Sequence, residues 1–437
     1  MPLLIGPGTV WTHGAAGVVS NGGVLVDGDR VVAVAGFDEL RAAWPGAELL
    51  DARGGLIMPG LTNAHTHLYG LFARGFAFPG PAARSFRQVL ERVWWRLDKG
   101  LTREATYLSA LYGLADHLRV GVTAVNDHHA GPAAIAGSLD EIARAASALG
   151  IRASLGYEVT DRNGPEGAAK GIAENVRFIA ADKPVTVKAT FGLHASFTLS
   201  DETLAACVNA AGDARFHIHL AEGPEDPADS LQRCGRRTSH RLAAAGILRP
   251  GTFVGHGVHL DAEEVALLAA TGAVLTHQPQ SNMGNAVGWP RILHMRERGV
   301  RVALGTDGYT PDMLETLRAA ATLHSHSMAT PGAGIGEFAE ILLNDNPTVL
   351  SELFGVPLGR LEPGAAADIA VADYHPPTPF DAGNAPFHLY FGLSSAHIAA
   401  VVVAGRVTVR DHRVLGLDEE ALAREAQQVA RAVWNSM

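Results

Sequence analysis

The sequence contains very little cysteine. Cys207 and Cys234 are the only two in 437 residues, and they form no Cys-x-x-Cys pair. This excludes zinc sites built from paired cysteines and the disulfide-rich frameworks of small secreted proteins. Any bound metal ion must therefore be held by histidine and carboxylate side chains, and we expect a reducing, cytoplasmic compartment.

Long apolar runs and basic clusters are missing as well. Nowhere do 18 apolar residues follow one another, and residues 1–10 carry no basic region ahead of an apolar segment. These absences argue against a membrane-spanning helix and against a secretory signal. The formal net charge is −10 at pH 7, without a local basic run, so we expect no nucleic-acid partner.

What the sequence does contain is a regular alternation from Thr102 onward. Helical segments, among them one predicted at residues 230–245, are separated by short apolar segments, and there are eight apolar segments when the one before His65 is counted. The other seven are residues 122–126, 151–159, 185–193, 215–220, 252–258, 273–276 and 300–305. Such alternation predicts parallel βαβ units, and eight units predict an α/β fold of the (β/α)8 TIM-barrel type.

The two ends of the chain have a different pattern. They carry short Val-rich segments separated by glycine turns, and a helical tail follows at residues 418–434. We expect the termini to pair into a small composite β-sandwich domain of residues 1–56 and 360–437. The catalytic barrel is expected to span residues 57–359.

Polar side chains close nearly every predicted barrel strand. In a barrel of this kind the chemistry takes place at the C-terminal ends of the strands. The residues found there are His65 and His67, then Asp127, His128 and His129, then His194, then His217, His219 and Glu222, then His256 and His259, then His277, and finally Asp307. Random placement of 20 histidines would not produce this distribution. The cluster predicts an active site.

The strongest local motif is the pair His65 and His67. Side chains two apart on a strand point the same way, so both rings could bind one metal ion, although two core histidines would give the same pattern. His219 and Asp307 follow strands five and eight, and a catalytic zinc site needs three or four such ligands. Asp307 could instead cap a turn or helix.

Further roles follow from position. Glu222 lies three residues beyond His219, where the chain could bring it over the metal as an acid or base, or leave it as a solvated loop carboxylate. His256 stands between two glycines and suits a proton carrier. His217 lies one layer deeper than His219, so we expect a structural role for it.

Substrate contacts are expected from the lid at residues 69–99 and from the remaining strand-end histidines. A flat ring would be held by stacking and by hydrogen bonds to its edge. The candidates are Tyr69, Arg74, Trp94, His128, His129, His194 and His277. Each of these side chains could equally serve packing.

Together these motifs resemble the amidohydrolase superfamily, in particular its aminohydrolase branch, and within it the SsnA-type aminohydrolases. The branch includes methylthioadenosine/S-adenosylhomocysteine deaminases, guanine deaminases and triazine hydrolases. The resemblance covers nearly the whole chain and rests on residues 59–67, 192–196, 219–222, 255–260, 281–288, 304–308 and 363–368. Residues 277–281 depart from the family pattern, which leaves the substrate open.

The resemblance implies one divalent metal ion, Zn²⁺ or Fe²⁺, with Glu222 and His256 catalytic and His194 near the substrate. The metal ligands it implies are His65, His67, His219 and Asp307. A bridging lysine, which binuclear relatives use, is rejected, because Lys188 lies six residues before His194.

The expected function is hydrolytic deamination of an aminated nitrogen heterocycle that is purine-, pterin- or nucleoside-like. A metal ion that lowers the pKa of bound water would support attack on the ring carbon, with release of ammonia. Cleavage of a cyclic amide or of a chlorinated triazine is the alternative on the same site. A non-catalytic metal-binding assembly protein is the alternative of another class. We also expect a homodimer or a higher homo-oligomer.

Overall fold

The computed structural model describes residues 1–78 and 80–437, so position 79 of the expected lid lies outside the described residues. Two parallel sheets form the barrel wall, in the order β6-β7-β8-β9 and β10-β11-β12-β13-β14. Their bounds are β6 Leu61–Thr66, β7 Val122–His129, β8 Arg152–Tyr157, β9 Val187–Ala189, β10 Phe191–Ala195, β11 Phe216–Leu220, β12 Phe253–His256, β13 Val274–His277 and β14 Arg301–Leu304. Because only Thr190 separates β9 from β10, they are two halves of one strand, and the expected eight-stranded barrel is confirmed.

Isolated bridges close the barrel between the two sheets. One joins Val159 to Leu193, and the other joins Thr66 to Asp307. The second closure brings β14 against β6 at Gly305, where an added Cβ would lie 2.7 Å from the Cβ of His65. A residue without a side chain is therefore required, and it allows Asp307 to reach the ligands on strand one.

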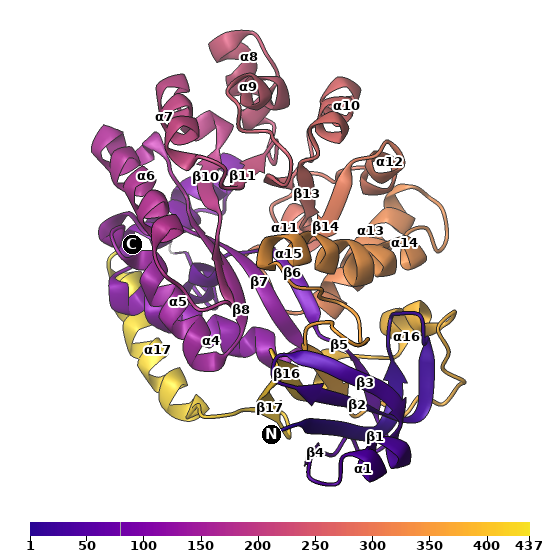
Figure 1. Cartoon of the computed structure of the whole chain (residues 1–437). Helices are drawn as coiled ribbons and strands as arrows, with labels where there is room; N and C mark the ends of the chain where they lie inside the picture. Colours follow the sequence, from indigo (N-terminus) through magenta and orange to yellow (C-terminus); the bar gives the residue numbers. More distant parts are fainter. Residues whose placement is uncertain (79) are drawn as a thin grey trace.

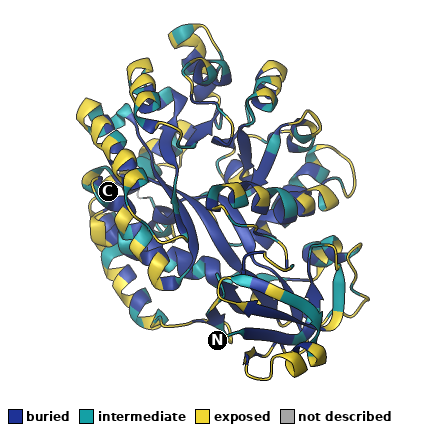
Figure 2. Ribbon diagram, in the orientation of Figure 1, coloured by how far each residue is buried: buried dark blue, intermediate teal, exposed yellow. Residues whose placement is uncertain are grey.

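Helices surround the strands, as Figure 1 shows. They include α4 Arg103–Arg119, α5 Ser138–Leu149, α6 Gly164–Ala180, α7 Asp201–Ala211, α10 Ala262–Thr271, α12 Ile292–Glu297, α13 Met313–Ser327, α14 Ile335–Glu340 and α15 Asn346–Phe354. Local sequence explains several of the ends. Thr102 and Ser200 cap α4 and α7, and Asp261 with Glu264 forms a capping box on α10. With helices outside and packed side chains inside, the barrel strands are buried on both faces (Figure 2).

One predicted helix was wrong. The pattern indicated a single helix at residues 230–245, whereas the chain forms α8 Glu225–Cys234 and α9 Thr238–Ala244. Gly235 ends α8 with a left-handed φ of 65°, which a glycine adopts without strain. The lid is also segmented, into η1 Leu68–Ala73, α2 Phe86–Val89, η2 Leu90–Trp94, α3 Trp95–Leu97 and η3 Asp98–Gly100.

Strands from both termini form one nine-stranded sheet beside the barrel. They are β1 Leu3–Trp11, β2 Val18–Asp27, β3 Arg30–Gly36, β4 Glu48–Leu50, β5 Leu56–Pro59, β15 Ile369–Ala372, β16 Ile398–Val403, β17 Arg406–Arg410 and β18 Arg413–Val414. The two termini meet where β5 pairs antiparallel with β15. Side chains from both ends share one apolar core, in which Ile5, Val24 and Val371 are buried.

Two further segments carry α-helices. They are α1 Phe37–Ala43 and α16 Ala385–Phe391. The C-terminal helix α17 Glu419–Asn435 packs along α4 (Figure 1). The helical tail was predicted from the sequence and begins after an Asp418 cap. In the described part of the chain, each helix is too short or too polar to cross a lipid bilayer.

Candidate active site at the barrel mouth

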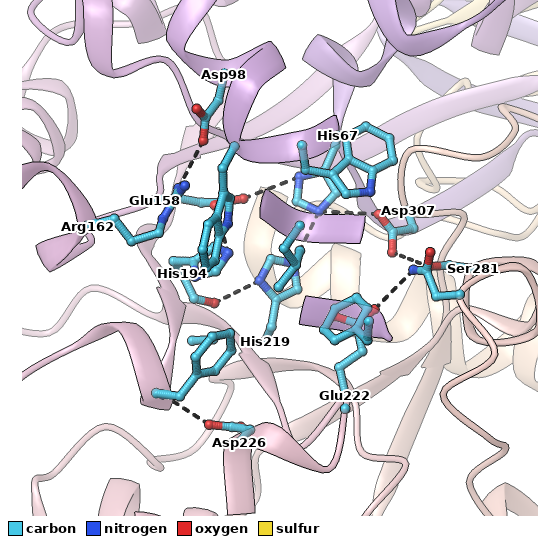
Figure 3. A pocket seen from close by; sticks show the side chains of 18 of the residues that line it. His67, Asp98, Glu158, Arg162, His194, His219, Glu222, Asp226, Ser281 and Asp307 are labelled. Atoms are coloured by element: carbon cyan, nitrogen blue, oxygen red, sulfur yellow. Dashed lines mark hydrogen bonds and ion pairs between the residues drawn. The ribbon is translucent and has the colours of Figure 1, made fainter. Parts of the chain in front are cut away.

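The four expected metal ligands lie together at the C-terminal end of the barrel. His65 belongs to β6 and His67 follows it, His219 belongs to β11, and Asp307 follows β14. The Nε2 atoms of His67 and His219 are 3.1 Å apart, and Asp307 Oδ1 lies 3.4 Å from His67 Nε2 (Figure 3). A ligand atom of His65 lies within 4.8 Å of those of His67 and Asp307.

An outer hydrogen bond orients each of the three imidazoles. His67 Nδ1 donates to the carbonyl oxygen of His128 at 2.6 Å, and His219 Nδ1 donates to that of His194 at 2.7 Å. His65 Nδ1 lies 2.7 Å from Nε2 of His217. Such outer partners fix the tautomer of metal-binding histidines and leave Nε2 free as the ligand atom. His217 is therefore placed to orient His65.

These residues fit a metal ion. With Nδ1 acting as the donor in His67 and His219, their Nε2 atoms both carry lone pairs, and two lone pairs at 3.1 Å repel unless a cation lies between them. Ligand nitrogens about 2.0 Å from a tetrahedral ion are roughly 3.3 Å apart, close to this separation. His65 Nε2 is buried and has no hydrogen-bond partner among residues 1–78 and 80–437. The barrel mouth is a metal-binding site.

The expected acid and base stand next to these ligands. Glu222 Oε2 lies 3.4 Å from His256 Nε2, and Asp307 Oδ2 lies 3.7 Å from the same nitrogen. His256 Nδ1 donates to Asn282 Oδ1 at 2.8 Å, so its Nε2 faces the two carboxyl groups. The φ angles of Ala221, His256 and Asp307 are 47°, 73° and 57°. Strained backbone of this kind is stored at functional sites.

The two carboxyl groups have pKa values shifted in opposite directions. Burial, reinforced by the negative charge of Asp307, raises the pKa of Glu222 well above its ordinary value. Burial acts in the same sense on Asp307, but His67 and His256 outweigh it and hold the pKa of that carboxyl below its ordinary value. A protonated acid and an ionised base can therefore coexist a few ångströms apart.

Neighbouring polar side chains hold the two carboxyl groups in place. Ser281 Oγ donates to Asp307 Oδ2 at 2.7 Å, and the backbone N–H of Gly308 donates to Oδ1 at 2.7 Å. Asn285 Nδ2 donates to Glu222 Oε1 at 3.4 Å. These contacts come from the segment that follows β13 and from the loop that follows β14, so both segments shape the site.

A cavity opens above these groups. Metal ligands and acid–base residues form one side of its lining, and aromatic side chains of the lid form another. The lining includes His67, Tyr69, Phe86, Leu90, Trp94, Trp95, Asp98, Glu158, Arg162, His194, Phe197, His219, Glu222, Ser281, Asn285 and Asp307. Three expected substrate contacts, Tyr69, Trp94 and His194, therefore line the space that a substrate would occupy.

The other four expected substrate contacts lie elsewhere. His128 is buried and stacks on His217 at 4.2 Å between ring centroids, and His129 lies 6.0 Å from the ring of Tyr69. Arg74 pairs with Asp116 at 2.8 Å beside a neighbouring hollow. His277 packs at 5.4 Å against His324, a core contact. The structure does not bring these four to the cavity that holds the acid and base.

Four charged residues of the cavity were missed in the sequence, and one of them, Asp226, lies on α8. Asp98 comes from the lid, and Glu158 and Arg162 follow β8, the one barrel strand for which no polar end residue was identified. Arg162 Nη2 donates to Asp98 Oδ2 at 2.9 Å, and burial raises the pKa of Glu158 well above its ordinary value. The signal was present, because Glu158 stands one residue before the end of the predicted strand 151–159, where polar strand-end residues are expected.

Sequence comparisons match the chain to a known family. Residues 56–408 match a family described as "Amidohydrolase family", and residues 22–47 match "Imidazolonepropionase-like composite domain, bacteria". The chain is 30% identical over 424 residues to a 5′-deoxyadenosine deaminase of Methanosarcina mazei, with 95% of this chain and 94% of the relative covered. It is 32% identical over 432 residues to a 5-methylthioadenosine/S-adenosylhomocysteine deaminase of Nitratidesulfovibrio vulgaris, with 96% and 94% covered.

Solved structures share the same fold. An adenosine deaminase from Xanthomonas campestris with bound zinc superposes with a TM-score of 0.87 at 23% identity, covering 99% of this chain and 98% of the other. A mutant atrazine chlorohydrolase from Arthrobacter aurescens, complexed with zinc and atraton, gives a TM-score of 0.82 at 25% identity, covering 98% and 100%.

Proposed function

The chain belongs to the amidohydrolase family and is a hydrolase of carbon–nitrogen bonds, and we propose that it is a zinc-dependent deaminase of an aminated purine base or nucleoside. The observation that carries this proposal is the pairing of Glu222 with Asp307 around His256. One carboxyl group is set to give a proton and the other to accept one, as the pKa directions indicate.

Hydrolytic deamination needs this pair of opposite roles. Asp307 and His256 are placed to accept the proton of the attacking water, because Asp307 Oδ2 and His256 Nε2 lie 3.7 Å apart beside the expected metal ligands. Glu222 supplies a proton to the ring nitrogen next to the aminated carbon and then takes the proton of the added hydroxyl as the carbonyl forms. The proton held by Asp307 passes to the amine, which leaves as ammonia. When bound, the metal ion supplies the acidity that makes water a nucleophile near neutral pH.

The remaining lining suits a flat aromatic substrate. Tyr69, Trp94, Trp95, Phe86 and Phe197 provide apolar faces around the cavity. Aromatic rings bind planar heterocycles by offset stacking, and the polar groups at the metal end fix the orientation of the ring. Both curated relatives named above are deaminases of purine nucleosides, which supports a purine rather than a triazine.

Zinc is proposed because of the donor set. Three imidazole nitrogens and one carboxylate oxygen match the ligand types of catalytic zinc sites. The adenosine deaminase of similar fold carries bound zinc, which supports the same choice here.

An ammonia-release screen tests the proposal. The purified protein is incubated with adenine, adenosine, 5′-deoxyadenosine, guanine, an aminated pterin and a chlorinated aminotriazine, and the metal content of the same sample is measured. We expect ammonia from at least one purine. Chloride release or ring opening without ammonia would support the alternative hydrolase reactions, and a zinc-loaded protein that releases nothing would contradict the proposal.

A further inference from the structure

Glu158 is a buried acid of the cavity that takes no part in the proposed reaction. It follows β8 directly, is 1% exposed, and lines the cavity together with the metal ligands His67 and His219. Neither of its carboxyl oxygens has a hydrogen-bond partner in the described part of the chain. Burying an unpaired carboxyl group is costly, so such a group in a native protein requires an explanation.

The arginine of the cavity, Arg162, is bonded to another carboxyl group and makes no ion pair with Glu158 in the described part of the chain. Arg162 donates to Asp98 Oδ2 at 2.9 Å, and its guanidinium lies 4.7 Å from the ring centre of Trp95. A charged pair of this kind, with one face stacked on an aromatic ring, holds the arginine in place. Its position fixes one wall of the cavity while the oxygens of Glu158 keep their hydrogen-bonding capacity.

Glu158 lies 3.4 Å from His67, 3.7 Å from His128 and 4.0 Å from His194, and the last of these imidazoles is an acceptor. Thr198 donates its hydroxyl hydrogen to the carbonyl oxygen of Ala195 at 3.0 Å, so its oxygen accepts the Nδ1–H of His194 at 2.8 Å. In this neutral tautomer His194 Nε2 carries a lone pair. That nitrogen lies 4.0 Å from Glu158 Oε2, too far for a direct hydrogen bond.

Two acceptors therefore face each other across a gap. These acceptors, Glu158 Oε2 and His194 Nε2, are 4.0 Å apart. A donor atom about 2.9 Å from each of them would bridge the gap, with an angle of roughly 90° between its two contacts. We propose that Glu158 and His194 form a recognition subsite for a hydrogen-bond donor of the substrate, an N–H or O–H group on the edge remote from the leaving amine.

The position of Glu158 supports this assignment. Figure 3 shows Glu158 and Glu222 on different sides of the pair His67 and His219. Glu222 serves the reacting edge of the ring, so Glu158 meets a different edge. The subsite rests on the proposed deaminase function and deepens it. It selects substrates that carry a donor there, either an unsubstituted ring N–H of a free base or a hydroxyl of a nucleoside.

Matched substrate pairs distinguish these two sources. Adenine is compared with 9-methyladenine, which lacks the ring N–H, and adenosine with 2′,3′-dideoxyadenosine, which lacks the 2′- and 3′-hydroxyls. Each compound is assayed for kcat/KM by ammonia release and for Kd by calorimetry. The proteins are the wild type, Glu158→Ala and Glu158→Gln. Glu264→Gln is the matched control, since Glu264 is buried but bonded to Ser239 and Arg237 outside the cavity.

In the wild type, we expect the donor-bearing member of one pair to bind roughly 10- to 100-fold more tightly, within the range for leaving a buried polar group without its hydrogen-bond partner. That preference should fall below about threefold in Glu158→Ala, fall partly in Glu158→Gln, which retains one acceptor, and remain in Glu264→Gln. If Glu158→Ala loses the preference within the adenine pair, the substrate is a free base. If it loses the preference within the adenosine pair, the substrate is a nucleoside.

Two results would overturn the subsite. One is a wild type that binds both members of each pair equally or not at all. The other is a uniform loss on all four compounds, or a loss of metal in Glu158→Gln, because Glu158 would then act only through His67, 3.4 Å away. Calorimetry keeps this test separate from the deamination assay: a wild type that binds with the predicted preference but releases no ammonia contradicts the proposed function alone.

Discussion

Metal binding by the proposed histidine ligands depends on which nitrogen of each imidazole carries the proton. His67 and His219 donate Nδ1–H to backbone carbonyls, whereas His65 uses another side chain, His217. A side-chain partner can be replaced by mutation without disturbing the backbone. This makes His217 the accessible test of how outer partners orient the ligands.

We predict that His217→Phe lowers zinc affinity by about 10- to 100-fold, the usual effect of removing such a partner. Without the acceptor at 2.7 Å, His65 is free to take the wrong tautomer or ring orientation. Competition with a chromogenic chelator measures the change. His217→Gln, which can offer an amide oxygen, should recover part of the affinity, and an unchanged affinity in the Phe variant would refute the orienting role.

Glu222 is predicted to act as an acid without holding the metal. Glu222→Gln should keep its zinc and lose at least about 10²-fold in kcat, the usual contribution of a general acid. The raised pKa of Glu222 means that the wild-type residue keeps its proton above the ordinary range and loses it as pH rises. The wild-type kcat should therefore fall on the alkaline side. Normal turnover by zinc-loaded Glu222→Gln would contradict the role of Glu222 as the acid.

Among the elements, the closure between β6 and β14 determines whether the ligands meet. Asn346 at the start of α15 spans this closure. Its Oδ1 accepts the N–H of Leu304 at 2.6 Å, and its Nδ2 donates to the carbonyl oxygens of Thr62 and Leu304 at 2.9 and 2.8 Å. One buried amide thus joins the first and last strands of the barrel beneath the metal ligands.

We predict that Asn346→Ala destabilises the protein by roughly 3 kcal/mol, because three buried backbone groups each lose a partner. Thermal unfolding should show a lower Tm, and zinc affinity should fall with it. Thr348→Ala is the control, since Thr348 is exposed on the same helix and such changes stay within about 0.5 kcal/mol. Equal Tm values for the two variants would contradict this account of the closure.

The elements also show what the sequence could and could not predict. Histidines at strand ends were predictable because strand periodicity and barrel geometry place them on one rim. The direction of Arg74 was not, because its pairing with Asp116 depends on how the lid packs against α4. Glu158 lies within the predicted strand 151–159 and was not recognised as a strand-end residue. The break between α8 and α9 depended on a single glycine, Gly235.

At the scale of the whole molecule, a buried ion pair joins the barrel to the terminal sheet. Arg152 on β8 donates to both oxygens of Asp368, at 2.8 and 3.0 Å, and both side chains are 2% exposed. Asp368 also accepts the N–H of Ala404. A second pair, Arg53 with Asp411, connects segments from opposite ends of the chain, but its side chains are 68% and 62% exposed.

These two pairs should differ sharply in their effect on stability. Arg152→Met should cost about 3–5 kcal/mol, because it leaves the Asp368 carboxylate buried with a partner removed. Arg53→Met should cost less than about 1 kcal/mol, since water screens an exposed pair. Denaturant unfolding measures both. Similar small losses would mean that the terminal sheet and the barrel do not depend on this contact. The homo-oligomer expected from the sequence stays a prediction.

The central claim is that this barrel releases ammonia from a purine with one metal ion per chain. The most direct measurement removes metal by chelation and then follows ammonia release as zinc is added back in known amounts. We predict a rate near zero in the apoprotein, a linear rise to one zinc per chain and a plateau beyond it. Ammonia release that is unchanged in the metal-free protein, or absent at full zinc loading with every purine, would contradict the account.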